Sequence, residues 1–171
     1  MIEEVLNCLP PEERRRLEEA LKPKREAERL GLPQGDGHRV FVYGTLLLGE
    51  CNEHWGDGAR RFAATTKGRI FDTGFGFPAY QPVGAEGVGD GEVITGEMLI
   101  VDDEGLARLD QLEGYPRLYR RERIQIQVED RGVETAWVYI MNRLPKGAQP
   151  IVGGDWRKHR AAWREERRRN A

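Results

Sequence analysis

The spacing of hydrophobic residues indicates a body rich in β-strands after residue 37. Residues 123–129 alternate, with Ile124, Ile126 and Val128 on one face, which is the pattern of a half-buried strand. Further short apolar stretches predict strands over residues 38–43, 61–66, 68–71, 92–101 and 135–141. One helix is predicted over residues 102–113, so helices and strands do not alternate along the chain. We therefore expect an α+β domain with a curled or barrel-like mixed sheet.

The first 36 residues predict a helical extension followed by a linker. The sequence Pro-Pro-Glu-Glu at residues 10–13 is a favourable helix start, and Leu17 and Leu21 lie one turn apart on one face. The glycine-rich segment 31–37 is typical of a linker. Such an extension can dock on its own domain or on a second subunit, so a homodimer formed through it is one expectation.

The last residues are basic. Residues 156–171 contain seven Lys or Arg and two Glu, whereas the whole chain has a formal net charge of −2. The plainest interpretation is a solvated helix that packs Trp156 and Trp163 against the core. A contact with RNA or an acidic partner is the alternative, but one short tail is a small electrostatic footprint. We divide the chain into an extension and linker (1–36), a main domain (37–157) and a basic helix or tail (158–171).

Composition excludes several classes of protein. The chain has 27 Lys and Arg against 29 Asp and Glu, which argues against binding nucleic acid or membrane by bulk electrostatics. No apolar run approaches the roughly 18–20 residues that span a bilayer. The first residues lack the apolar core of a secretory signal, and two cysteines cannot form a disulfide framework. We therefore expect a cytoplasmic protein.

The first candidate for chemistry follows the strand predicted at residues 38–43. The strand runs into Tyr43-Gly44-Thr45-Leu46, a sequence typical of a sharp turn. Gly44 permits a positive φ or a close approach of another group to the backbone. Successive backbone N–H groups in such a turn can bind a carboxylate or a developing oxyanion. Taken alone, however, the motif is more typical of an ordinary glycine turn.

The second candidate is Glu113, in the last turn of the predicted helix. At 3.6 residues per turn, Glu113 lies between Leu106 and Leu109 on the apolar face. Burial raises the pKa of a carboxyl group and the C-terminal end of a helix acts in the same direction, which suits a general base that must later return its proton. The alternatives are a side chain frayed into solvent or an ion pair with a nearby arginine: Arg117, Arg120 or Arg121.

Several sequences occur together in a recognisable order, namely YGTLLLGECN, Phe77-Pro78-Ala79, GEMLIV, LARLDQLEGYPRLYRRERI and TAWVYI. In this order they resemble the γ-glutamylcyclotransferase superfamily, and most closely its AIG2-like branch, which includes γ-glutamylamine cyclotransferases. The resemblance covers about residues 38–157 and ends with Gly154-Asp155-Trp156. Tyr-Gly-Thr-Leu followed about seventy residues later by Leu-Glu-Gly-Tyr-Pro is far more specific than either motif alone.

The resemblance implies a small mixed β-barrel with flanking helices and a pocket at its mouth. It also implies an acid/base role for Glu113. It implies further that substrate is held by the loop and by two aromatic positions, which are Tyr43, Gly44, Thr45, Leu46, Tyr119 and Tyr139. For Tyr119 and Tyr139 the alternative is core packing with a satisfied hydroxyl, which is at least as common.

The implied reaction converts an L-γ-glutamyl amine or peptide to 5-oxoproline and a free amine. Glu113 would take a proton from the α-ammonium, the freed amine would attack the γ-carbonyl, and Glu113 would protonate the departing nitrogen. Backbone donors of the loop would hold either the α-carboxylate or the oxyanion. The reaction implies a small-molecule substrate and neither a metal nor a cofactor.

The chain departs from the family pattern beside the loop. That pattern usually continues with basic residues and an Asn-His pair, whereas this chain has Leu47 and Leu48, and Glu53 stands between Asn52 and His54. Glu113 is retained, so the acid/base step is unaffected. The departure puts in doubt the side of the pocket that would hold the leaving amine.

Other interpretations have weaker support. His38, His54 and His159 are scattered, without partners at metal-ligand spacing, and Cys51 has no evident base. The segment 87–91 contains Gly-x-Gly but precedes a strand, which argues against a dinucleotide site. Two alternatives of another class remain: a non-catalytic AIG2-like binding or assembly module, and an adaptor that binds RNA or protein through the basic tail.

Overall fold

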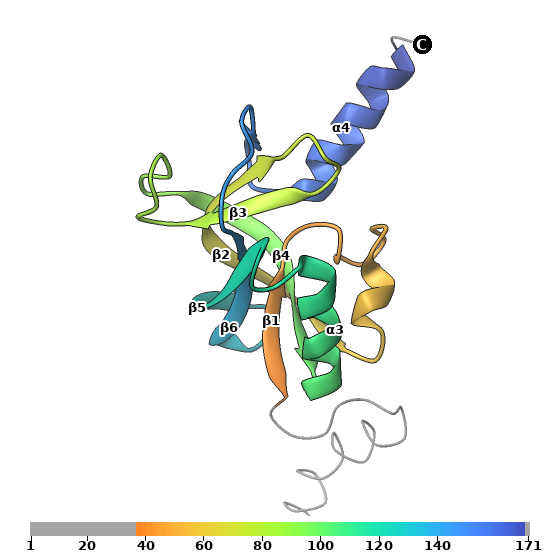
Figure 1. Cartoon of the computed structure of the whole chain (residues 1–171), viewed down its shortest axis with the longest axis vertical. Coiled ribbons are helices and arrows are strands. Elements are labelled where there is room, and N and C mark those ends of the chain that lie inside the picture. Colours follow the sequence, from red (N-terminus) through yellow and green to blue (C-terminus); the bar gives the residue numbers. More distant parts are fainter. Residues whose placement is uncertain (1–36, 170–171) are drawn as a thin grey trace, which may run out of the picture.

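The structure is a computed structural model that describes residues 37–169. It contains seven strands, one short 3₁₀ helix and two longer helices (Figure 1). In chain order these are β1 (His38–Val42), η1 (Glu53–Gly56), β2 (Arg60–Asp72), β3 (Pro78–Pro82), β4 (Glu92–Val101), α3 (Asp103–Glu113), β5 (Tyr119–Val128), β6 (Gly132–Met141), β7 (Gln149–Pro150) and α4 (Trp156–Arg169). The predicted extension at residues 1–36, and the dimer contact expected of it, lie outside the described residues.

Five strands close into a barrel in the order β2-β4-β1-β6-β5, because β5 pairs back onto β2 at Ala64–Val128 and Thr65–Gln127. Strands β1 and β6 run parallel, and the other neighbours in the barrel are antiparallel. The expected α+β fold with a mixed barrel is therefore confirmed. Fully buried apolar side chains of its strands form the core, among them Phe41, Met98, Leu99, Val138 and Ile140.

The two strands predicted at residues 61–66 and 68–71 are one continuous strand, β2. Gly68, which interrupts the hydrophobic pattern, is the residue at which β2 changes partner from β4 to β3. A Cβ atom at Gly68 would lie 2.4 Å from the ring of Tyr80, so β3 can approach only because residue 68 has no side chain. The pattern analysis missed β3, a five-residue strand with proline at both ends.

Helix α3 ends as predicted, at Glu113, and begins one residue later than predicted, at Asp103. The side chain of Asp102 accepts a 2.7 Å hydrogen bond from the N–H of Gly105, which caps the first turn. Gly114 ends the helix with φ 62°, a left-handed conformation that favours glycine. Leu109 is fully buried, so the face carrying the leucines packs against the barrel as expected.

Helix α4 projects away from the barrel (Figure 1). Trp156 is buried in the core as expected, but Trp163 is 43% exposed, so the prediction that both rings pack against the core is wrong for Trp163. Instead the guanidinium groups of Arg160 and Arg167 lie 6.0 and 4.8 Å from the centre of the Trp163 ring. None of the described helices is long and apolar enough to cross a membrane.

Candidate active site

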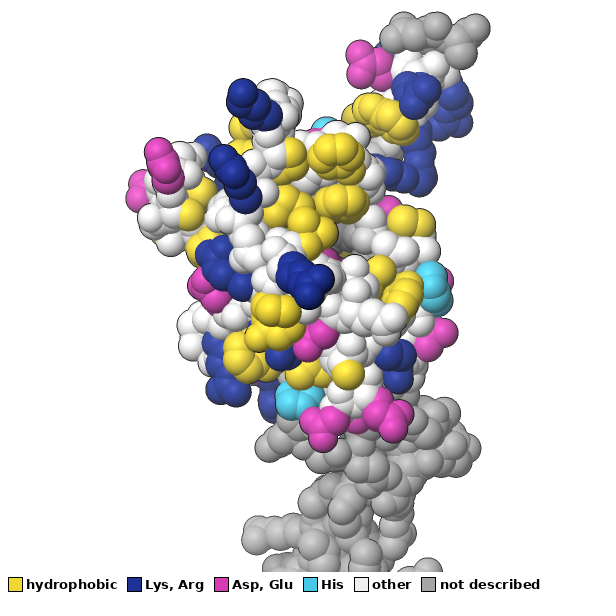
Figure 2. All heavy atoms as spheres, in the orientation of Figure 1, with side chains coloured by type: hydrophobic (Ala, Val, Ile, Leu, Met, Phe, Trp, Pro, Cys, Tyr) yellow, Lys and Arg dark blue, Asp and Glu magenta, His cyan; other side chains and the backbone are white. Residues whose placement is uncertain are grey.

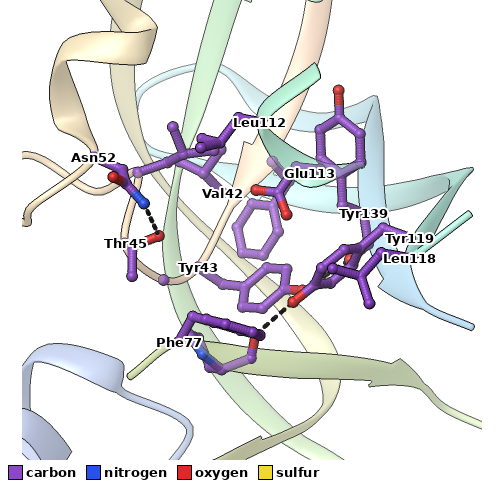
Figure 3. A pocket seen from close by; sticks show the side chains of 14 residues that line it. Val42, Tyr43, Thr45, Asn52, Phe77, Leu112, Glu113, Leu118, Tyr119 and Tyr139 are labelled. Carbon is purple, nitrogen blue, oxygen red and sulfur yellow. Dashed lines mark hydrogen bonds between the residues drawn. The ribbon is translucent and has the colours of Figure 1, made fainter. Parts of the chain in front are cut away.

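A cavity of about 240 Å³ opens beside the end of helix α3 (Figure 3). Strands β1, β3, β5 and β6, helix α3 and the loop after β1 all contribute to it. The cavity is lined by Phe41, Val42, Tyr43, Gly44, Thr45, Leu46, Asn52, Phe77, Pro78, Leu112, Glu113, Leu118, Tyr119 and Tyr139. The structure thus brings together all seven residues that the sequence analysis singled out, although they come from three separate parts of the chain.

Glu113 is the last residue of α3, and the end of this helix places its side chain at the cavity. The N–H of Tyr115 donates a 2.9 Å hydrogen bond to the carbonyl of Asp110, and Gly114 turns the chain away from the helix axis. Figure 3 shows the Glu113 carboxylate pointing into the cavity, between Leu112 and the tyrosine rings. The expected inward orientation is therefore what the structure shows.

The electrostatic environment of Glu113 is unusual for a carboxylate. Burial raises the pKa of Glu113 from 4.5 to about 7. Within residues 37–169, no protein group forms a hydrogen bond or ion pair with this carboxylate. A carboxyl group with a pKa near 7 can both accept and return a proton close to neutral pH.

Two of the three arginines that could have neutralised Glu113, Arg120 and Arg121, have other partners. Arg121 lies 3.2 Å from Asp110, and Arg120 lies 2.6 Å from Glu122. Arg121 also stacks over the ring of Trp137 at 5.2 Å. The alternative of an ion pair at Glu113 is thus not seen among the described residues.

Three tyrosine rings form walls of the cavity, but their hydroxyl groups are engaged elsewhere. Tyr43 donates to the carbonyl of Tyr139 at 2.8 Å, Tyr119 donates to the carbonyl of Pro78 at 3.2 Å, and Tyr139 donates to Asp110 at 2.7 Å. Burial raises the pKa of each of these hydroxyls above its ordinary value. The rings therefore shape the cavity, and the satisfied hydroxyls that the sequence analysis raised as an alternative are present.

The loop after β1 lines one side of the cavity. A Cβ atom at Gly44 would lie 2.6 Å from the Pro78 ring, so this glycine is needed for a close approach and not for a positive φ. Asn52 holds the loop through two hydrogen bonds to Thr45, one of 3.0 Å to its carbonyl and one of 3.1 Å to its hydroxyl. Among the described residues, no protein acceptor receives the N–H of Thr45 or of Leu46. These two amides are suitably placed to bind an anion.

A partly buried cluster of three charged side chains, which the sequence analysis missed, holds the loop after β1. Its members are Glu97, Arg61 and Arg157, and none of them lines the cavity. Glu97 accepts the N–H of Leu48 at 3.2 Å and pairs with Arg61 at 2.8 Å and with Arg157. Arg61 donates to the carbonyl of Leu46 at 3.0 Å, and Arg157 donates to that of Leu48 at 2.7 Å. The available signal was a glutamate within the otherwise apolar strand GEMLIV, since such a carboxylate needs partners when buried.

The residues that depart from the family pattern lie outside this cavity. Leu47 is buried in the core, and Leu48 is 61% exposed, yet neither lines the cavity. Cys51 is exposed and does not line it either. His38 and His159 each contact one aspartate, and no group of three metal-ligating side chains occurs in the described part of the chain.

The fold is a closed mixed barrel, and Glu113 points into a cavity that the loop after β1 also lines. Comparison with known proteins identifies the family: residues 40–158 match the model described as gamma-glutamyl cyclotransferase, AIG2-like. The chain belongs to this family, and the expected class of enzyme is confirmed at that level.

Three similar proteins illustrate the relationship. A Drosophila melanogaster relative, CG2811, is 38% identical over 63% of this chain and 71% of its own length. The gamma-L-glutamyl-butirosin B gamma-glutamyl cyclotransferase of Niallia circulans is 35% identical over 61% of this chain and 67% of its own length. The crystal structure of an AIG2-like protein from Mus musculus superposes with a TM-score of 0.52 and 26% identity, covering 63% of this chain and 79% of that one.

Proposed function

We propose that this protein converts an L-γ-glutamyl amine or peptide to 5-oxoproline and a free amine, with Glu113 as the general acid and base. The observation that carries the proposal is the position of Glu113. Its carboxylate, with a pKa raised by burial to about 7, faces the same cavity as the unpaired amides of Thr45 and Leu46. The family relationship supports the same reaction.

The proposed reaction begins with proton transfer from the substrate α-ammonium to the Glu113 carboxylate. The freed amine attacks the γ-carbonyl carbon, which forms the lactam C–N bond, and the protonated Glu113 then donates to the departing nitrogen as the original amide C–N bond breaks. The attacking nitrogen loses a second proton as the lactam forms, and solvent water carries it to the departing amine, so the products are 5-oxoproline and an ammonium. Glu113 returns to its starting charge.

The backbone amides of Thr45 and Leu46 have a distinct proposed role. They would bind either the substrate α-carboxylate or the oxyanion that forms during attack. Because the nucleophile and the carbonyl belong to one molecule, the enzyme mainly has to hold the substrate chain in a folded conformation. Well-oriented intramolecular reactions reach effective molarities on the order of 10⁵ M or more. The steps consist of proton transfers and acyl transfer, which require neither a metal nor a cofactor.

The experiment that tests the proposal measures 5-oxoproline after incubation with γ-glutamyl-ε-lysine, γ-glutamyl amino acids or glutathione. The wild-type protein should release 5-oxoproline from at least one of these compounds. Glu113→Gln, which removes the base and preserves the side-chain shape, should abolish release while circular dichroism shows an unchanged fold. Equal release by both proteins from every compound would overturn the mechanism. Binding without turnover would favour the non-catalytic AIG2-like module instead.

We also propose the domain division, the cytoplasmic location and the homodimer that the sequence predicts. The family match at residues 40–158 supports a main domain at 37–157, with the extension 1–36 and the tail 158–171 outside it. A cytoplasmic location would suit a small-molecule γ-glutamyl substrate. Size-exclusion chromatography of the full chain and of a form lacking residues 1–36 tests whether the extension forms a homodimer.

A further inference from the structure

We propose that the cavity selects γ-glutamyl amides whose leaving amine carries a neutral, apolar group. This inference rests on the proposed function and names the substrate class of the same site. Among the described residues that line the cavity, Glu113 is the only Asp, Glu, Lys, Arg or His. The proposed mechanism already uses that side chain, so the lining offers no second charge to a charged leaving group.

The size of the cavity assigns the leaving amine to its rim. A cavity of about 150 Å³ accommodates a molecule the size of benzene. The observed volume of about 240 Å³ therefore suits a glutamyl group and little more. With the α-ammonium beside Glu113 and an anionic oxygen at the Thr45 and Leu46 amides, the rest of the substrate must point toward the opening.

The rim is apolar on the side of β3 and β5. Phe77, Leu112 and Leu118 line the cavity and are partly or well exposed, Leu118 at 47%. Phe75 extends this surface outward, since its ring stacks on that of Phe77 with the centres 6.2 Å apart. Figure 2 shows hydrophobic side chains gathered on the upper half of the face in view, with Lys and Arg side chains among them.

A charged leaving amine would be disfavoured at this rim for two reasons. A carboxylate would lose water without gaining a counter-ion from the residues that line the cavity, and it would be repelled by ionised Glu113. An ammonium could pair with Glu113 only by replacing the α-ammonium that must lose its proton, which gives an unproductive complex. A neutral alkyl or aryl group instead gains contacts with Phe77 and Leu118.

The test uses three amides of matched length: γ-L-glutamyl-n-pentylamide, γ-L-glutamyl-4-aminobutanoate and the γ-L-glutamyl monoamide of 1,4-diaminobutane. They present a methyl, a carboxylate and an ammonium at the same distance from the scissile bond. The inference predicts that kcat/KM for 5-oxoproline release is about tenfold or more higher for the pentylamide than for either charged amide. Equal or higher values for a charged amide would overturn it.

A charge placed on the rim should change this preference. Leu118→Lys should raise kcat/KM for the aminobutanoate amide relative to the pentylamide by about tenfold, because the new ammonium supplies the missing counter-ion. Val152→Lys, at a position 93% exposed and outside the cavity, should leave the ratio unchanged. An unchanged ratio in Leu118→Lys would contradict the assignment of the leaving amine to this rim.

Binding distinguishes failure of this inference from failure of the proposed function. If neither these amides nor γ-glutamyl-ε-lysine, γ-glutamyl amino acids and glutathione release 5-oxoproline, the proposed reaction is wrong. Calorimetry of the same three amides with the wild-type protein still tests selectivity. Binding of the pentylamide about tenfold or more tighter than that of both charged amides would support the apolar rim. Equal binding of the three, or tighter binding of a charged amide, would overturn it.

Discussion

The hydroxyl of Tyr139 donates a 2.7 Å hydrogen bond to Asp110, one turn before Glu113 on helix α3. Arg121 lies 3.2 Å from the same carboxylate. Asp110 therefore engages both a hydrogen-bond donor and a cation. Two carboxylates on one helix thus have different environments, and only Glu113 is left to react with a ligand in the cavity.

Replacing Asp110 with alanine should lower the pKa of Glu113. Arg121 would lose its carboxylate partner and become available to Glu113, three residues after Asp110 on the same helix. An opposite charge at short range lowers the pKa of a carboxyl group by about one unit or more. The acidic limb of the pH profile of kcat/KM should therefore move to lower pH. Glu104→Gln, an exposed site in the first turn of the same helix, is the control. An unmoved limb in Asp110→Ala would show that Asp110 does not shield Glu113.

Glu113→Gln should stabilise the protein at high pH. The folded-state pKa of about 7 lies above the ordinary value of 4.5, so Glu113 costs no stability below about pH 4.5 and progressively more as the pH rises through 7. The full difference corresponds to about 3 kcal/mol. Denaturant unfolding should therefore show a larger gain for Glu113→Gln over wild type at pH 8 than at pH 4.5. A gain that is the same at both pH values would mean that Glu113 is not buried as an ionisable group.

Gly44→Ala should impair activity by displacing the loop. The new methyl group would lie 2.6 Å from the ring of Pro78, a rigid neighbour, so the amides of Thr45 and Leu46 would shift. We expect kcat/KM to fall about tenfold or more. Gly44→Ala combined with Pro78→Ala should recover part of the activity because it removes the collision. Wild-type activity in the single variant would contradict the need for this close approach.

Glu97→Gln should weaken both the fold and the loop. The substitution leaves Arg61 and Arg157 without their counter-ion, and breaking a buried pair of this kind costs about 3 kcal/mol. The carbonyl of Leu46, which Arg61 holds, would be less well fixed, so kcat/KM should also fall. Glu122→Gln is the matched control, because its pair with Arg120 is on the surface and contributes about 1 kcal/mol or less. Equal effects of the two substitutions on unfolding would refute the anchoring role of Glu97.

The sequence indicated which residues lie together at the cavity better than it indicated the details of the sheet. Glu113 could be identified because its position on the helix depends on residues within two turns, and Gly114 marks where that helix ends. Strand β3 and the partner change at Gly68 could not be identified in this way. They depend on Tyr80 packing over a residue twelve positions away, and local periodicity does not report such a contact.

Long-range hydrogen bonds also could not be predicted from the local hydrophobic pattern. The bond from Tyr139 to Asp110 spans 29 positions, and the pair of Arg61 with Glu97 spans 36. The prediction that Trp163 is buried failed for a related reason. A spacing of seven residues puts Trp156 and Trp163 on similar faces of a helix. It does not indicate that the helix leaves the core before it reaches Trp163. Only the folded structure shows how far a helix remains in contact with the core.

The most direct test of the central claim is the pH dependence of 5-oxoproline release by wild-type protein and Glu113→Gln. A γ-L-glutamyl amide that the wild type accepts serves as substrate, and kcat/KM is measured between pH 5 and pH 9. The account predicts that wild-type kcat/KM rises as the pH passes through about 7, since the carboxylate form of Glu113 accepts the proton. Glu113→Gln should be lower by about 10² or more and should lack this rise. Comparable rates with the same pH profile in both proteins would contradict a role for Glu113 as the acid and base.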